Sequence, residues 1–158
     1  MPNITFIETD EKGLDMVRPL WEKLRDHHRA MSRDFKKRYE EMSFEKRKEE
    51  LQEKSRNGLL RVDMAIENDT DQCIGYCITS LCLEKGEKAG EIDSIYIEKD
   101  FRSMGIGDTF LERAEKWMDT GGAITKKVSI AAGNEDVLSF YGRYGYRPKF
   151  ITLEQVKK

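Results

Sequence analysis

The sequence predicts a mixed α/β (α+β) fold, in which helices flank a sheet that is largely antiparallel. Residues 59–97 contain three apolar, β-type segments joined only by short turns, which is typical of an antiparallel meander. Residues 14–54 carry helical periodicity and many charges. Residues 106–118 repeat apolar side chains at helical spacing after a glycine-containing turn. These three patterns together favour a sheet with helices packed against it.

The composition predicts a single domain, residues 1–158, that folds without disulfides or a metal. A chain of 158 residues is long enough to bury its own core. Cys73, Cys77 and Cys82 lie in or beside one apolar segment with no histidine nearby, so we expect reduced, buried thiols and no metal site. No apolar run approaches the roughly 20 residues that span a bilayer. No basic-then-apolar leader opens the chain, which favours a cytoplasmic protein with no membrane partner.

The charge of the chain is small overall but uneven along its length. The formal net charge of −2 argues against a general nucleic-acid binder. Residues 12–61 are rich in Lys and Arg, whereas residues 62–120 are rich in Asp and Glu. An acidic region beside a binding site would favour a cationic, amine-bearing substrate. Solvated surface charge explains the same pattern equally well.

The chain begins with a short predicted strand at residues 3–8, followed by helical periodicity over residues 14–31. His27 and His28 are adjacent on that helix, so their side chains point about 100° apart and cannot hold one ion together. We expect one histidine to face the core or a cleft and the other to face water.

The middle of the chain predicts one more helix and then the meander. Ser43 is placed to cap a helix over residues 44–54. Two strands follow, at residues 59–67 and 73–83, with Gly75 as the expected site of a bulge.

The last part of the chain predicts two helices and two strands after the central strand. Gly121-Gly122 ends the first of these helices, and residues 128–132 alternate as a fifth strand. Asn134 is placed to cap the second helix, which Gly145 closes. Residues 146–153 predict the final strand.

The turn at residues 102–107 lies between a buried strand and an amphipathic helix, and this order favours an anion site. The first backbone N–H groups of a helix have no intrahelical partner and lie at the positive end of its dipole. Gly105 and Gly107 remove the Cβ atoms that would keep a phosphate away from those N–H groups. No Lys-Ser/Thr pair follows the second glycine, which excludes a P-loop, and the glycine spacing excludes the Rossmann fingerprint.

Two segments of the chain resemble motifs of one family, the GCN5-related N-acetyltransferase (GNAT) superfamily. The run Arg102-Ser103-Met104-Gly105-Ile106-Gly107 resembles its Arg/Gln-x-x-Gly-x-Gly/Ala motif. Asn134 followed by Phe140-Tyr141-Gly142-Arg143-Tyr144-Gly145-Tyr146 resembles its closing segment, typically Asn followed by Phe-Tyr-x-x-x-Gly-Phe/Tyr. The segments stand in the family's order and extend the resemblance over residues 90–153. It implies a GNAT-like sheet that is splayed open at an acyl-CoA site.

The resemblance implies acetyl-CoA as a co-substrate and suggests which residues would bind it. Amides of the loop would hold its pyrophosphate, which makes candidates of Arg102, Ser103, Met104, Gly105, Ile106 and Gly107. Backbone N–H groups around Ile95, Tyr96 and Ile97 would polarise the thioester carbonyl, and Asn134 would hydrogen-bond the pantetheine arm. Two residues depart from the family pattern: Ser103 stands where glycine or lysine is frequent, and Asp108 places an acid beside the pyrophosphate.

The candidate catalytic residues are Tyr141, Glu91 and Asp93. Loss of a proton from the amine calls for a carboxylate, and Glu91 and Asp93 lie two residues apart on one face of the central strand. One would be the base or the amine anchor; simple strand-edge acids are the alternative. Tyr141 matches the family's tyrosine, whose phenol can protonate the leaving thiolate, unless it is a core residue. The resemblance also implies that Tyr39 and Phe44 line one wall of the acceptor site; the alternative is a solvated helix pair.

The sequence thus predicts an acetyl-CoA-dependent N-acetyltransferase that transfers an acetyl group directly to a primary amine. The acceptor would be a small molecule or a protein amine. The alternative is a non-catalytic, GNAT-like module that binds acyl-CoA as a sensor or interaction partner. The resemblance also implies a homodimer formed through the C-terminal strand.

Overall fold

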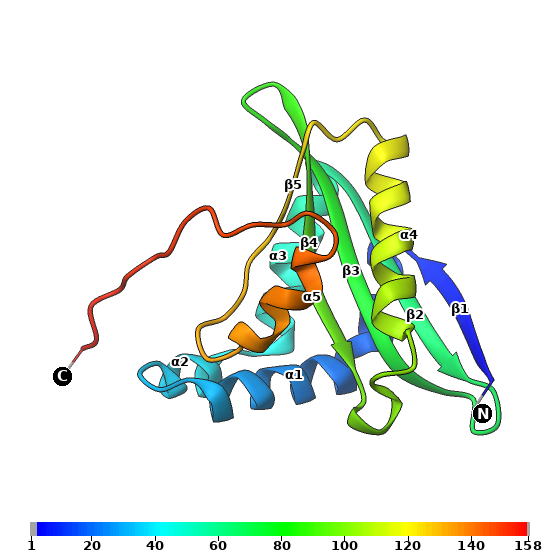
Figure 1. Ribbon diagram of the computed structural model, residues 1–158, viewed down its shortest axis with the longest axis horizontal. Helices are drawn as coiled ribbons and strands as arrows, with labels where there is room; N and C mark the ends of the chain where they lie inside the picture. The colour runs from blue at the N-terminus through cyan, green and yellow to red at the C-terminus, as the bar shows by residue number, and fades with distance from the viewer. Residues whose placement is uncertain (1–2, 158) are drawn as a thin grey trace.

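A five-stranded sheet organises the computed structural model, which describes residues 3–157 (Figure 1). The label η marks short 3₁₀ helices. In chain order the elements are β1 (Ile4–Thr9), η1 (Glu11–Val17), α1 (Arg18–Met31), α2 (Lys36–Glu41), α3 (Phe44–Arg56), β2 (Gly58–Glu67), β3 (Gln72–Glu84), β4 (Glu87–Ile97), η2 (Lys99–Phe101), α4 (Ile106–Thr120), β5 (Thr125–Val128), η3 (Glu135–Val137) and α5 (Leu138–Gly142).

The sheet has the order β1-β2-β3-β4-β5, and its first four strands are antiparallel neighbours. β5 pairs parallel with β4 over four residues, where 89–92 lie opposite 125–128. Beyond Ile92 the two strands separate, and the chain after β5 crosses toward α5 (Figure 1). The predicted fold class, a largely antiparallel sheet flanked by helices and splayed at one edge, is confirmed.

Helices cover both faces of the sheet and divide the core into two clusters. On one face, α1 and α3 pack against alternate residues of β2 and β3, and Trp21 meets Phe44 edge to face at 5.6 Å. On the other face, the apolar stripe of α4 is buried against β3 and β4, with Phe110, Leu111 and Ala114 fully buried. The helical periodicity of each segment therefore gives the face that it buries.

The boundaries of several elements follow the capping residues that the sequence contains. The Ser43 hydroxyl accepts a hydrogen bond from the backbone N–H of Lys46 and begins α3, as predicted. Gly121 and Gly122 end α4, and Gly122 adopts the left-handed conformation at φ 85°.

Two bulges interrupt the ladders on either side of β3. In the pairing of β2 with β3, Ala65 lies opposite Gly75 and Ile66 opposite Cys73, so the extra residue is Ile74, next to the predicted position. In the pairing of β3 with β4, Ile78 lies opposite Ser94 and Thr79 opposite Ile92. The extra residue of β4 is Asp93, and a bulge re-aims the side chain at the point where it occurs.

The C-terminal part of the chain differs from the prediction. The fifth strand ends at Val128, because the segment that follows diverges from β4 and finds no ladder partner. Residues 146–153 form no strand, and Phe150 and Leu153 are 83% and 92% exposed. Their alternating pattern suits a strand, but none of the five strands of the sheet pairs with them, so their backbone makes no ladder hydrogen bonds.

The second predicted helix is also shorter than its apolar pattern suggests. It is a turn of 3₁₀ helix, η3, followed by α5, which ends at Gly142 instead of continuing to Gly145. Asn134 stands at its start, but its side chain makes no capping hydrogen bond.

The three cysteines differ in burial. Cys77 is buried, as predicted, whereas Cys73 and Cys82 are only partly buried; all three thiols are free. Over residues 3–157, no helix combines the length and the apolar character that a membrane span requires.

Candidate active site

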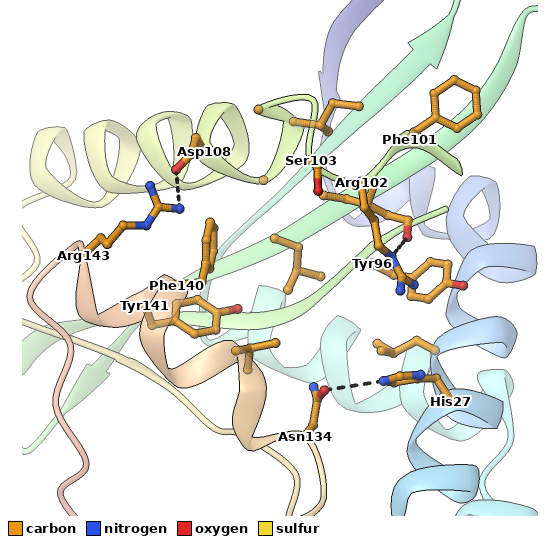
Figure 2. A pocket seen from close by; sticks show the side chains of 17 residues that line it. His27, Tyr96, Phe101, Arg102, Ser103, Asp108, Asn134, Phe140, Tyr141 and Arg143 are labelled. Carbon is orange, nitrogen blue, oxygen red and sulfur yellow. Dashed lines mark hydrogen bonds and ion pairs between the residues drawn. The ribbon is translucent and has the colours of Figure 1, made fainter. Parts of the chain in front are cut away.

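A cavity of about 370 Å³ lies where β4 and β5 separate, between the α4 N-terminus, α5 and α1 (Figure 2). It brings together segments that are far apart in the sequence. Every predicted cofactor-binding residue lines it except Met104, which is exposed: the lining includes Ile95, Tyr96, Ile97, Arg102, Ser103, Gly105, Ile106, Gly107, Asn134 and Tyr141. The sequence-based choice of these residues therefore defines a single space in the fold.

The turn before α4 has the geometry of an anion cradle. Gly105 has φ 80° and begins α4 without a side-chain cap, so the first N–H groups of the helix keep no side-chain partner. A Cβ at Gly105 would meet no atom within 4 Å and would instead enter the open space before the helix. The free amides, the helix dipole and the missing Cβ all fit a phosphate group.

Gly107 also lies close to the neighbouring helix α5. A Cβ at Gly107 would lie 3.3 Å from the ring of Phe140. This glycine therefore allows α5 to pack closely against the first turn of α4. Of the two glycines, only Gly105 borders open space, where a Cβ would meet no atom within 4 Å.

Arg102 ties the loop to the end of β4. Its Nε donates a hydrogen bond to the carbonyl oxygen of Ile97 at 2.9 Å, and its guanidinium lies 5.3 Å from the centre of the Tyr96 ring (Figure 2). The side chain therefore holds the shape of the loop.

Asp108 is compensated by residues of the C-terminal segment. Nη2 of Arg143 lies 3.1 Å from Asp108 Oδ1 (Figure 2). The Tyr144 hydroxyl donates a hydrogen bond to the same oxygen. Asp108, the acid beside the predicted phosphate site, thus pairs with a cation and accepts a hydrogen bond.

Tyr141 is buried in the apolar lining and directs its hydroxyl into the cavity (Figure 2). Its ring packs edge to face against Phe140 and Tyr146, with centroids at 5.2 Å and 6.0 Å. Burial raises the pKa of the Tyr141 phenol above its ordinary value, so the phenol keeps its proton at neutral pH. Tyr144 and Tyr146 differ, because their hydroxyls already donate to Asp108 and Glu115.

Glu91 and Asp93 do not line this cavity. They lie at the bulge of β4, and Lys54 of α3 bridges them: its Nζ is 2.9 Å from Glu91 Oε1 and also contacts Asp93 Oδ1. The Asp93 side chain is fully buried, and its Oδ2 accepts no hydrogen bond from the described residues. Burial raises the pKa of Asp93, and the neighbouring Lys54 offsets part of that rise.

His27 is a cavity residue whose position the sequence left open. Its Nε2 lies 3.5 Å from the side-chain oxygen of Asn134 (Figure 2). Leu24, one helical turn before it on α1, lines the same cavity. His28 instead packs against the Tyr39 ring, with centroids 5.6 Å apart. The i, i+3 relation between Leu24 and His27 is the signal that identifies the cavity-facing side of α1.

Neither residue of the predicted acceptor wall, Tyr39 or Phe44, lines the cavity. Phe44 is 2% exposed and packs against Trp21 in the core, so it cannot contact an acceptor. Its apolar ring gains more from burial under α1 than from a position in an open cleft. Tyr39 lies near the surface against His28.

Comparison with known proteins identifies the family. Residues 21–146 match the Acetyltransferase (GNAT) family, so the chain belongs to it. It is similar to an uncharacterised N-acetyltransferase of Methanocaldococcus jannaschii, with 30% identity over 79 residues, which cover 48% of this chain and 34% of that protein. The matched region therefore spans about a third of the length of that relative.

Solved structures share the whole fold. A Pyrococcus furiosus protein assigned as an acetyltransferase superposes with a TM-score of 0.68 at 24% identity, covering 96% of this chain and 99% of that chain. An aminoglycoside N-acetyltransferase in complex with CoA gives 0.69 at 13% identity, covering 100% and 97%. At these identities the likeness establishes the fold, and the predicted GNAT-like architecture is confirmed.

Proposed function

We propose that the chain is an acetyl-CoA-dependent N-acetyltransferase that transfers an acetyl group directly to a primary amine. Membership of an acetyltransferase family supports the reaction class. The observation that carries the proposal is the cavity itself, in which the glycine turn, the edge of β4 and the Tyr141 hydroxyl converge. A neighbour of the same fold holds CoA, which favours this group of ligands.

Each part of the cavity has a separate task in this proposal. When bound, acetyl-CoA supplies a thioester as the acetyl donor. The α4 N-terminus, opened by Gly105, binds anionic phosphate, and Arg102 keeps the loop in shape. Beyond Ile92, the edge of β4 that faces away from β3 has no strand beside it among residues 3–157, so its backbone groups around Ile95 and Ile97 are free to bind and polarise a carbonyl.

Proton transfer is assigned to Tyr141 of α5 and to Glu91 or Asp93 of β4. Tyr141 holds a proton on its buried hydroxyl and gives it to the departing sulfur. Glu91 or Asp93 takes the proton that the acceptor ammonium loses, because both carboxylates lie at the bulge of β4. Asn134 remains a candidate for the pantetheine arm, and His27 lies opposite it.

The test is a thiol-release assay across an amine panel, run beside calorimetry with CoA. The panel contains a polyamine, an aminoglycoside, an amino acid and a peptide. We expect CoA to bind and thiol release to depend on at least one amine. CoA binding with no amine-dependent release would favour the non-catalytic sensor, and an absence of CoA binding would refute both functions.

We also propose that the C-terminal segment forms a homodimer. Phe150, Ile151 and Leu153 are each more than four-fifths exposed in an extended segment. A contiguous apolar segment of this kind favours an intermolecular contact. Pairing with a second copy would supply the strand partner that the segment lacks in its own chain.

A further inference from the structure

Lys54 extends from the last turn of α3 to the bulge of β4 and ends between two carboxylates. Its Nζ lies 2.9 Å from Glu91 Oε1 and contacts Asp93 Oδ1. The lysine and the acids are 37 and 39 positions apart in the chain, so only the tertiary fold brings them together. The arrangement is a primary ammonium held by a pair of carboxylates.

The two carboxylates need a cation beside them because they are largely buried. The Asp93 side chain is fully buried and the Glu91 side chain is 23% exposed. Removing one partner from a buried ion pair leaves an uncompensated charge, which is strongly destabilising. Burial alone would lower the pKa of Lys54, but the hydrogen bonds and charges of Asp93 and Glu91 raise it, so the lysine is an ammonium at neutral pH.

The backbone at Asp93 has an anchor besides Lys54. Nη2 of Arg47 donates a hydrogen bond to the backbone carbonyl of Asp93 at 3.0 Å, and this bond holds the bulge. Asp93 also keeps an oxygen, Oδ2, that the lysine leaves unbonded. The backbone bond and the free acceptor oxygen both remain if another ammonium replaces that of Lys54.

The lysine side chain is able to leave. It is 32% exposed, and its flexible four-carbon stem reaches water by rotation. The backbone carbonyl of Lys54 accepts a weak hydrogen bond from the Cys82 thiol, which ties the helix but not the ammonium. Release of the ammonium thus needs no change in α3.

We propose that Glu91 and Asp93 form the subsite for the primary ammonium of the acceptor, and that Lys54 fills this subsite until the acceptor displaces it. The inference rests on the proposed function, which it deepens. It gives the acceptor class as a primary ammonium on a slender alkyl stem, the chemistry that the site already binds in Lys54. It also gives Lys54 a role in specificity, since only a competing cation can release it without leaving buried charge.

The test replaces the internal ammonium with an external one. Lys54→Ala empties the subsite and is expected to lower the Tm by roughly 5–15 °C. Methylammonium chloride should then restore at least half of the lost Tm. Equal concentrations of sodium chloride and of tetramethylammonium chloride should not, because neither ion donates the N–H hydrogen bonds that the carboxylates accept.

Lys48→Ala is the matched control. Lys48 is on the same helix, is 30% exposed and pairs with Asp15 at 2.8 Å, but Asp15 itself is 73% exposed. Water therefore replaces the lost lysine there, and methylammonium should raise the Tm of this variant no more than sodium chloride does. Equal responses of the two alanine variants to the three salts would overturn the proposal.

A second variant covers the case in which Lys54→Ala does not fold. Lys54→Met keeps most of the stem and removes the charge that competes with the acceptor. We expect its acceptor KM to fall at least severalfold while the Kd of CoA is unchanged. A higher acceptor KM would mean that Lys54 supports acceptor binding in place, and would overturn the displacement.

The two proposals can fail separately. The Tm measurements need neither acetyl-CoA nor turnover, so they report on the ammonium subsite alone. CoA calorimetry and the thiol-release assay report on the acetyltransferase function. Restoration of the Tm without any turnover would retain the subsite and refute the reaction.

Discussion

Arg143, which follows α5, pairs with Asp108 in the first turn of α4, with Nη2 3.1 Å from Oδ1. The pair joins the end of α5 to the first turn of α4, and it neutralises the acid nearest to the proposed phosphate site (Figure 2). Arg143 also lies over the Phe140 ring at 5.2 Å. Arg143 thus neutralises Asp108 beside the cavity and packs against Phe140 of α5.

Arg143→Ala should weaken CoA binding because it exposes the phosphates to the charge of Asp108. The Arg143 and Asp108 side chains are 60% and 37% exposed, so solvent screens the pair. The Kd of CoA should therefore rise only roughly two- to fivefold. Adding Asp108→Asn should recover the affinity, as a double-mutant cycle by calorimetry would show. An identical loss in the single and double variants would assign Arg143 to packing alone.

Gly105→Ala should reduce CoA affinity at least about tenfold, because the Cβ enters the space that the phosphate needs. The left-handed φ of 80° adds a backbone cost of about 1–2 kcal/mol. Gly86→Ala is the control, since Gly86 has φ 81° and equally open surroundings in the turn between β3 and β4. It should lose stability without losing CoA affinity; equal losses of affinity would refute the cradle.

The local patterns predicted most of the fold because each element is decided by its own neighbours. Ser43 caps α3 and the apolar stripe of α4 is buried, as the spacing of these residues indicates. Residues 146–153 show the limit of this reasoning. Their alternation is suited to a strand, but a strand also needs an available edge, and that depends on where other segments lie.

In the candidate site too, the sequence predicts what local chemistry decides and misses what tertiary contacts decide. The loop at residues 102–107 was recognisable because backbone chemistry depends on local sequence. Glu91 and Asp93 were identified by their acidity, but their partner Lys54 comes from a helix 37 positions or more away. His27 lines the cavity because the fold brings α1 to Asn134, which is 107 positions away in the chain. Contacts between distant segments have no local signature.

Substitutions at residues 146–153 should change the oligomeric mass of the protein, because these residues form the proposed dimer contact. The wild-type chain should elute as a dimer in size-exclusion chromatography with light scattering, and Phe150→Ser with Leu153→Ser should elute as a monomer. Ile124→Ser is the control, since Ile124 is an apolar residue of similar character that is 68% exposed before β5. A wild-type monomer at all concentrations would contradict the proposed dimer.

His28 should make the fold less stable in mild acid. Burial lowers the pKa of His28 below its ordinary 6.5, and the charge of His27 adds to this effect. The unfolded chain therefore binds the proton more tightly, so the contribution is complete above the ordinary pKa and is lost as the pH falls below it. Urea unfolding from pH 5 to 8 should show a shallower loss in His28→Gln; parallel curves would exclude the effect.

Tyr141→Phe is the most direct test of the proposed chemistry. The substitution keeps the buried ring, with its edge contacts to Phe140 and Tyr146, and removes only the hydroxyl that points into the cavity. No protein hydrogen bond to that hydroxyl exists among the described residues, so the Tm should change little. A general acid contributes roughly 10²–10⁴-fold, and kcat should therefore fall at least about tenfold while the Kd of CoA holds.

Tyr146→Phe is the control for a tyrosine of the same cluster. Its hydroxyl donates to Glu115 at 2.6 Å, so removing it should lower stability and leave kcat unchanged. The alternative for Tyr141, a core residue without a chemical task, predicts normal turnover with phenylalanine and a lower Tm with alanine. If pre-steady-state kinetics show that acetyl transfer limits the rate, unchanged kcat in Tyr141→Phe decides for the core role, because no proton donor would then have been lost.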